Sequence, residues 1–337
     1  ASNGPSMLAL SMPSFRLQWL VLIALALLLL LQGSPHEAGS LERDHRHADG
    51  GTPEDDAKAC AASQDPNVSS LDPLYTSVMA GVMRDFAAAS RRKYDPADAD
   101  RQFNEWWSRP GTLEDYSSEQ LQRSYTEKLL MKRMELDLEY LGMACGSGLE
   151  DDHGFSNMRR EESINAVVFG CGPAPELWSL LLFLQATGGP RVSRAVLMDA
   201  APWGATIAEL QSTFLEHLAL QSPSPLQTPG VQFYMADLRD VFGPASSEGL
   251  LGKFDRQRLN VIFMHHLAWD FGLDRMGGWF ERFLDFLAAN DVRAEVFAAA
   301  AGPHIKVYQA PRGWTRKVFA EEGRTNKYRN FYCFKRS

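Results

Sequence analysis

The second half of the chain alternates short apolar runs with longer stretches in which large apolar residues recur every three or four positions. The apolar runs predict five strands, at residues 165–170, 194–199, 231–237, 259–265 and 294–299. The periodic stretches predict helices, at residues 175–187, 203–220 and 277–290. This alternation is typical of an α/β fold, a doubly wound parallel sheet covered by helices on both faces. Because such a sheet binds ligands beyond the carboxyl ends of its strands, the polar residues directly after each strand are the candidates for function.

A helical region precedes the sheet, at residues 67–150. Two apolar stripes with helical spacing predict two helices there, and they consist of Leu74, Val78, Val82 and Phe86, and of Leu130, Met134, Leu138 and Leu141. Trp106 and Trp107 fall between the stripes. We expect both tryptophans in the connection between the two helices, where they pack rather than bind a substrate.

The C-terminal segment combines basic and aromatic residues. Nine lysines and arginines lie between Lys306 and Ser337, interleaved with Tyr328, Phe331, Tyr332 and Phe334. Such a mixture can bind single-stranded nucleic acid. The interpretation we favour is structural: residues 315–320 and 330–335 form a terminal antiparallel strand pair whose charges face solvent.

The N-terminus predicts membrane targeting. Residues 17–31 are leucine-rich with Gln18 as the only polar residue, and Arg16 precedes them. A basic flank, an apolar stretch and small residues after it are typical of a signal peptide or short anchor, here residues 1–33, although a buried core helix is an alternative. Residues 34–66 are rich in Gly, Ser, Pro, Asp and His and predict a disordered linker. The acidic residues after the apolar run favour a lumenal position for the rest of the chain, and plastid targeting is an alternative.

Composition narrows the function classes. Hydrophobic residues make up 45% and the net charge is −8, which excludes a wholly disordered chain and a generic polyanion binder. Four scattered cysteines without a C-x-x-C pair argue against a zinc ribbon, a thioredoxin-type motif and a dense disulfide scaffold. We predict no metal site from sequence, because no cluster of metal ligands is visible, and no nucleophilic Ser/His/Asp set is visible either.

Three strand ends carry residues suited to a nucleoside ligand. The first strand runs into Gly170-Cys171-Gly172-Pro173, where glycines allow a ligand to approach the backbone, and a helix follows. Asp199 and Asp237 end the second and third strands. No Gly-Lys-Ser/Thr follows the loop, so it is not a phosphate-binding P-loop. Pro175 stands where a dinucleotide fingerprint requires its third Gly or Ala.

These motifs resemble those of the class I S-adenosylmethionine-dependent methyltransferases. The stretches are VVFGCGPAPEL at 167–177, LMDAAPW at 197–203 and MADL at 235–238. The resemblance implies a Rossmann-like catalytic domain over residues 151–337, with residues 67–150 as a helical cap that shapes the pocket for the methyl acceptor. It implies that S-adenosylmethionine is the cofactor. In the implied site Gly170 and Gly172 face the methionine part, Asp199 the ribose and Asp237 the adenine, and the neighbouring residues are Cys171, Pro173, Glu176, Ala200 and Leu238.

The catalytic end is marked by His265 and His266, directly after the fourth strand. The family's Asn/Asp-Pro-Pro-Tyr signature is absent, which argues against the amino groups of bases or of glutamine as acceptors. Either histidine is placed to remove a proton from the acceptor, and a histidine held by local hydrogen bonds is the alternative. A methyltransferase-like binding protein without catalysis and a nicotinamide-dependent reductase are the competing functions. The acceptor and the oligomeric state stay open.

Overall fold

The computed structural model describes residues 71–108, 115–146, 157–221, 229–239, 247–265, 267, 273–300, 308–320 and 330–336. They all belong to one unit. The predicted anchor at 1–33 and linker at 34–66 lie outside the described residues. Within the described ranges, no helix has both the length and the apolar character that crossing a membrane requires.

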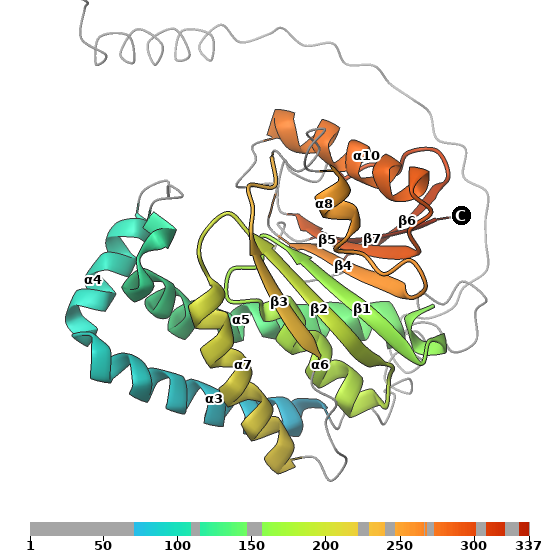
Figure 1. Ribbon diagram of the computed structural model, residues 1–337. Helices are drawn as coiled ribbons and strands as arrows, with labels where there is room; N and C mark the ends of the chain where they lie inside the picture. Colours follow the sequence, from blue (N-terminus) through green and yellow to red (C-terminus); the bar gives the residue numbers. More distant parts are fainter. Residues whose placement is uncertain are drawn as a thin grey trace, which may run out of the picture. The chain divides into compact units, whose positions relative to one another are not determined.

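A seven-stranded sheet forms the centre of the unit, with the strand order β3-β2-β1-β4-β5-β7-β6 (Figure 1). Strands β1 to β5 are parallel, and β7 pairs antiparallel with both β5 and β6. The strands are β1 Ser163–Phe169, β2 Arg191–Asp199, β3 Gly230–Met235, β4 Leu259–His265, β5 Ala294–Ala300, β6 Trp314–Ala320 and β7 Asn330–Arg336. All five predicted strands and the terminal antiparallel pair are therefore confirmed, with shifts at some ends.

Helices cover both faces of the sheet. The covering helices are α6 Pro175–Thr187 and α7 Gly204–Gln221 on one face, and α8 Ser247–Leu251 and α10 Leu273–Ala289 on the other. Along β1 the side chains alternate between two cores: Ala166 and Val168 pack in the core under α6 and α7, and Val167 and Phe169 in the core under α10. This alternation is the period of two expected of a strand. The three predicted helices are confirmed, and the five-residue α8 was not predicted.

The helical region before the sheet consists of α3 Leu71–Lys93, α4 Pro96–Trp107 and α5 Glu119–Gly146, with short 3-10 helices at Asp115–Ser117 and Met158–Arg160. Its apolar stripes pack in the same core as α6 and α7, where all their residues but the partly buried Leu74 are buried. Helix α5 crosses the sheet near the carboxyl ends of the strands: Gln122 donates to the Pro202 carbonyl after β2, and Tyr140 donates to the Tyr332 carbonyl in β7. Tyr140 also stacks on Phe331, with ring centroids 4.4 Å apart. Helix α5 therefore covers the part of this face that α6 and α7 leave open.

The position expected for the two tryptophans was wrong. Trp106 lies in the last turn of α4 rather than in a connection, and it is buried between Phe103, Tyr116 and Tyr125. The start of α4 explains the difference, because Asp95 caps the helix by accepting from the Ala97 N–H and a proline follows at the first helical position. The packing role of Trp106, however, is as expected.

Glu295 makes the stability of the sheet dependent on pH. This β5 side chain is 1% exposed, and burial raises its pKa from 4.5 to about 7 despite Lys335 on the paired strand. In the folded chain Glu295 keeps a proton that the unfolded chain loses above pH 4.5. The free energy of unfolding therefore falls as the pH rises from about 4.5 to about 7. We predict that Glu295→Gln removes this loss and exceeds the wild type at pH 8 by up to about 3 kcal/mol, with little difference at pH 5.

Urea unfolding at pH 5 and pH 8 measures this difference. Glu281→Gln, at an exposed position of α10, is the control and should follow the wild type at both pH values. Parallel pH profiles for Glu295→Gln and the wild type would contradict the prediction.

Candidate functional site

The loop after β1 is a tight turn built on glycines. Gly170 and Gly172 have φ values of +63° and +48°, which favour glycine. The Gly170 and Cys171 N–H groups donate to the Met198 carbonyl at 2.8 and 3.2 Å, which ties the turn to β2. A Cβ at Gly170 would lie 2.4 Å from the Leu267 side chain, whereas one at Gly172 would meet no described residue nearer than the Trp203 ring at 4.0 Å. Gly170 is thus needed for packing, and at Gly172 the described residues leave room for a ligand.

Asp199, at the end of β2, joins the loops that follow β1 and β2. One of its carboxylate oxygens accepts the Gly172 N–H and the other accepts the Ala201 N–H, both at 2.9 Å. Burial raises the pKa of Asp199, and these two N–H groups oppose the rise. Each carboxylate oxygen has a second lone pair, so Asp199 can still accept hydrogen bonds from a ligand's hydroxyl groups. The structure thus brings together two of the predicted site residues, Gly172 and Asp199.

Asp237 lies after β3 with its carboxylate already engaged. It accepts the Arg239 backbone N–H at 2.9 Å and also pairs with the Arg239 guanidinium, which lowers the pKa of Asp237. The next residue, Leu238, is buried, and its carbonyl accepts the Trp279 indole N–H at 2.6 Å. An adenine that bound to Asp237 would therefore compete with Arg239.

The other predicted loop residues differ in exposure. Cys171 is 1% exposed, its side chain packs in the core, and burial raises the pKa of its thiol. The Pro173 carbonyl accepts the Trp178 indole N–H at 2.7 Å. Ala200 is half-buried. Of these three residues, Ala200 has the side chain that is open enough to touch a ligand.

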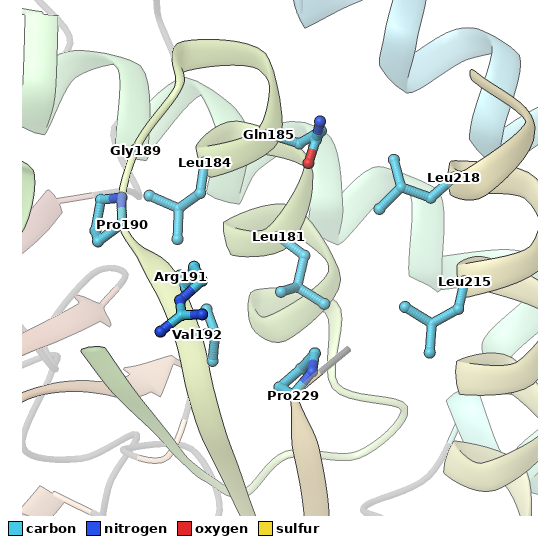
Figure 2. A pocket seen from close by; sticks show the side chains of 10 residues that line it. All are labelled: Leu181, Leu184, Gln185, Gly189, Pro190, Arg191, Val192, Leu215, Leu218 and Pro229. Carbon is cyan, nitrogen blue, oxygen red and sulfur yellow. The ribbon is translucent and has the colours of Figure 1, made fainter. Parts of the chain in front are cut away.

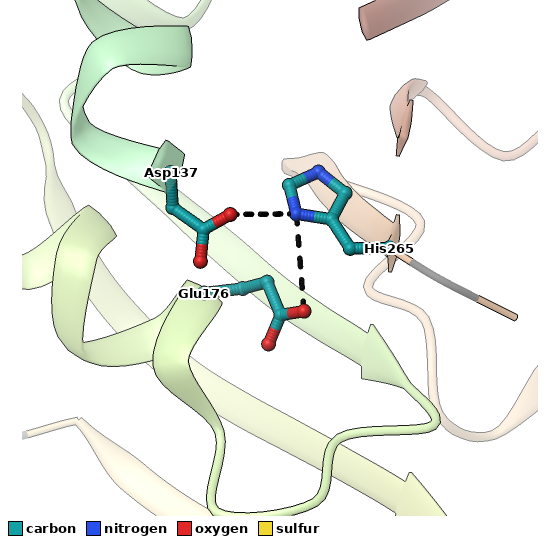
Figure 3. Close-up of side chains that lie close together, drawn as sticks. All are labelled: Asp137, Glu176 and His265. Atoms are coloured by element: carbon teal, nitrogen blue, oxygen red, sulfur yellow. Dashed lines mark hydrogen bonds and ion pairs between the residues drawn. The ribbon is translucent and has the colours of Figure 1, made fainter. Parts of the chain in front are cut away.

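Glu176 and His265 meet in a buried cluster with Asp137, a residue that sequence reasoning did not identify (Figure 3). The His265 Nδ1 lies 2.7 Å from an oxygen of Asp137 and 3.8 Å from an oxygen of Glu176. All three side chains are at most 6% exposed. Burial and the neighbouring Asp137 raise the pKa of Glu176. Burial lowers the pKa of His265, but the negative charges of Asp137 and Glu176 raise it by a larger amount, so the net change is upward.

The cluster changes the expectation for Glu176, which the resemblance placed beside the cofactor. The Glu176 side chain is in the first turn of α6 and faces Asp137 and His265, within the buried cluster. His265 ends β4 as predicted, and its role as a base stays a prediction. His266 lies outside the described residues. No ligand cluster was visible in the sequence because Asp137 and His265 are 128 positions apart.

Arg133 places a positive charge near the cluster, one turn before Asp137 on α5. Its guanidinium lies 5.2 Å from the centre of the Tyr125 ring. Burial lowers the pKa of Arg133, and Tyr125, Glu176 and Asp137 together raise it by more. One sequence feature could have identified Arg133 and Asp137. Each directly precedes a residue of the apolar stripe, Met134 or Leu138, where a charged side chain is unusual.

One cavity lies at the opposite end of the strands. It has a volume of about 190 Å³ and sits between α6 and α7, next to the starts of β2 and β3 (Figure 2). Its lining consists of Leu181, Leu184, Gln185, Gly189, Pro190, Arg191, Val192, Leu215, Leu218 and Pro229. Gly172 and Asp199 do not line it, so this cavity is separate from the predicted cofactor site.

The sheet decides the fold type. Five parallel strands in the order 3-2-1-4-5, with an antiparallel seventh strand inserted beside the fifth, match the resemblance seen in the motifs. The fold is Rossmann-like and of the methyltransferase type. No protein-family model and no curated protein matches this chain.

Solved structures with a similar fold include three bacterial proteins. An rRNA methylase from Streptococcus thermophilus has a TM-score of 0.34 and 8% identity, with 60% of this chain and 96% of that chain covered. A proposed O-methyltransferase from Klebsiella pneumoniae has a TM-score of 0.31 and 14% identity, covering 62% and 90%. A DUF574 family protein from Streptomyces avermitilis has a TM-score of 0.34 and 11% identity, covering 73% and 92%. At these identities and TM-scores, no property of these proteins is carried over to this chain.

Asp199 should also stabilise the fold, because it is the acceptor for two backbone N–H groups. We predict that Asp199→Ala lowers the free energy of unfolding by about 2 kcal/mol, since both donors lose their partner. Asp199→Asn keeps one carbonyl acceptor and should cost less. Urea unfolding measures both values, with Asp285→Ala on the exposed side of α10 as a control expected to stay within about 0.5 kcal/mol of the wild type. Wild-type stability in Asp199→Ala would show that these hydrogen bonds contribute nothing.

Proposed function

We propose that this chain is an S-adenosylmethionine-dependent methyltransferase. The observation that carries the proposal is the contact between the glycine loop after β1 and the carboxylate after β2, through the Gly172 N–H and Asp199. The two strands are neighbours in a sheet of the methyltransferase type. A loop open to a ligand and an acid that can accept from a ribose therefore lie side by side at the carboxyl edge.

The residues present fit this cofactor. Among the described residues none crowds Gly172, so they allow a ligand to approach the backbone there closely. Asp199 retains acceptor capacity for the two ribose hydroxyls after its contacts with Gly172 and Ala201. Pro175 at the start of α6 removes a backbone N–H where a pyrophosphate would need close approach, which favours an adenosyl sulfonium over a dinucleotide.

Chain residues in this site bind and orient rather than react. When bound, the cofactor supplies a methyl group on a positively charged sulfur. Gly170 and Gly172 shape the backbone that meets its methionine part, and Asp199 fixes the ribose. Arg133 supplies a positive charge near Glu176, in the first turn of the helix that follows the glycine loop, and this charge is suited to the methionine carboxylate. Alignment of the acceptor with the methyl group is then the main source of rate.

An aromatic group borders this site on the side of the helical region. Tyr116 and Tyr125 contact the Trp203 ring, with centroids 6.2 and 5.6 Å apart, and Trp203 is the side chain nearest to a Cβ at Gly172. Trp203 and Tyr125 are buried and Tyr116 is half-buried, so these rings exclude water beside the loop and support its shape from below. The acceptor itself stays unassigned in this proposal.

Calorimetric titration of the full chain with S-adenosylhomocysteine tests the proposal. We expect the wild type to bind S-adenosylhomocysteine with micromolar affinity and not to bind NADH. Asp199→Asn should weaken binding about tenfold and Asp199→Ala about ten- to a hundredfold, because hydrogen bonds to the ribose are lost. Asp285→Ala should bind like the wild type.

Two results would count against the function. If the wild type gives no heat with S-adenosylhomocysteine, or if both Asp199 variants bind as the wild type does, the cofactor assignment is wrong. Binding without any conversion of S-adenosylmethionine to S-adenosylhomocysteine across a panel of acceptors would favour the binding protein without catalysis.

A further inference from the structure

We propose that Asp137, Glu176 and His265 form a binding site for one divalent transition-metal ion. The three side chains come from α5, from the first turn of α6 and from the end of β4. Each offers one ligand atom, and these atoms all lie within 4.8 Å of one another. The assignment does not rest on the proposed function, because neither Asp199 nor Gly172 takes part in it.

The geometry is close to that of a bound ion. In a tetrahedral site with bonds of about 2.1 Å, ligand atoms are about 3.4 Å apart. The separations from the His265 Nδ1 are 2.7 Å to Asp137 and 3.8 Å to Glu176, one shorter and one longer than this value. All three ligand atoms lie within 4.8 Å of one another, so they surround a space of the size that one such ion occupies. Figure 3 shows both carboxyl groups turned toward the imidazole.

A second observation points to a cation. Each carboxylate has one oxygen, Oδ2 of Asp137 and Oε2 of Glu176, that is buried and has no hydrogen-bond partner among the described residues. The side chains are 6% and 2% exposed, so water cannot readily serve both oxygens. Burying carboxylate oxygens without partners is costly. Arg133 adds a positive charge that acts on both carboxylates, but neither of these two oxygens receives a hydrogen bond from a described residue. A divalent ion between the carboxylates would bind both oxygens directly and remove that cost.

The donor set narrows the choice of ion. Two carboxylates and one imidazole nitrogen suit Zn²⁺, Mn²⁺ or Fe²⁺. Ca²⁺ takes six to eight oxygen ligands and is a poor match. An ion here would connect α5 to α6 and β4. It would therefore fasten the helical region to the sheet at the start of α6, directly after the glycine loop.

Metal titration of the full chain tests this site. Protein stripped with a chelator and dialysed is titrated with Zn²⁺ and Mn²⁺ by calorimetry, and thermal unfolding is followed with and without each ion. We expect one ion per chain at this site with micromolar or tighter affinity for at least one of the two, a raised unfolding temperature, and no response to Ca²⁺. Asp137→Asn, Glu176→Gln and His265→Ala should each weaken this binding at least tenfold.

Glu295→Gln is the matched control, because it removes another buried carboxylate from the sheet, beside Val261 and away from the cluster. It should bind metal as the wild type does. Circular dichroism establishes that each variant is folded, and Glu176→Gln keeps the shape of the side chain. The predicted linker contains three more histidines, His36, His45 and His47, whose binding of metal would be unaffected by the cluster variants. Binding that survives unchanged in all three cluster variants therefore overturns the proposal, as does the absence of binding.

The test separates this inference from the proposed function. Titration of the stripped protein with S-adenosylhomocysteine reports on the cofactor site alone. Failure to bind metal with normal cofactor binding removes the metal site only and leaves the predicted base role of His265 in place. Metal binding without cofactor binding contradicts the methyltransferase proposal and supports the metal site.

Discussion

The central strands of the sheet are buried on both faces, and this constraint decides where polar side chains can lie. Every residue of β4 and nearly every residue of β1 is buried, so their middles accept few polar groups. Polar chemistry therefore collects where the strands end, at Asp199, Asp237 and His265. The turns that leave these ends need N–H acceptors, and Asp199 provides two of them while remaining able to bind a ligand.

Helix α5 connects this edge to the region before the sheet. Its Tyr140 covers β5, β6 and β7 through contacts with Phe297, Phe319 and Phe331, a surface that α6 and α7 do not reach. The same helix carries Arg133 and Asp137 to the carboxyl edge. Because one element does both, the fold of the helical region and the composition of the site are linked. A second link is the buried Arg123, which pairs with Glu209 of α7.

Hydrophobic periodicity and helix-start residues in the sequence predicted the strands of the sheet and the helices between them. The bounds of β4 and α6 match the apolar runs, since hydrophobic periodicity and proline at a helix start act over a few residues. Trp106 was misplaced because the Asp95–Pro96 helix start was not recognised. The pairing of Asp137 with His265 could not be predicted, because it depends on how α5 crosses the sheet rather than on any spacing along the chain. The inward orientation of Glu176 has the same origin, since the face of α6 that packs against α5 is set by tertiary contacts.

Hydrogen exchange followed by mass spectrometry, with and without S-adenosylhomocysteine, tests most directly whether the carboxyl edge is the cofactor site. The account predicts slower exchange in peptides that cover residues 170–176 and 199–203. It predicts no change in residues 185–192, beside the cavity at the other end of the strands. Protection confined to residues 185–192, or no protection at a saturating ligand concentration, would contradict it.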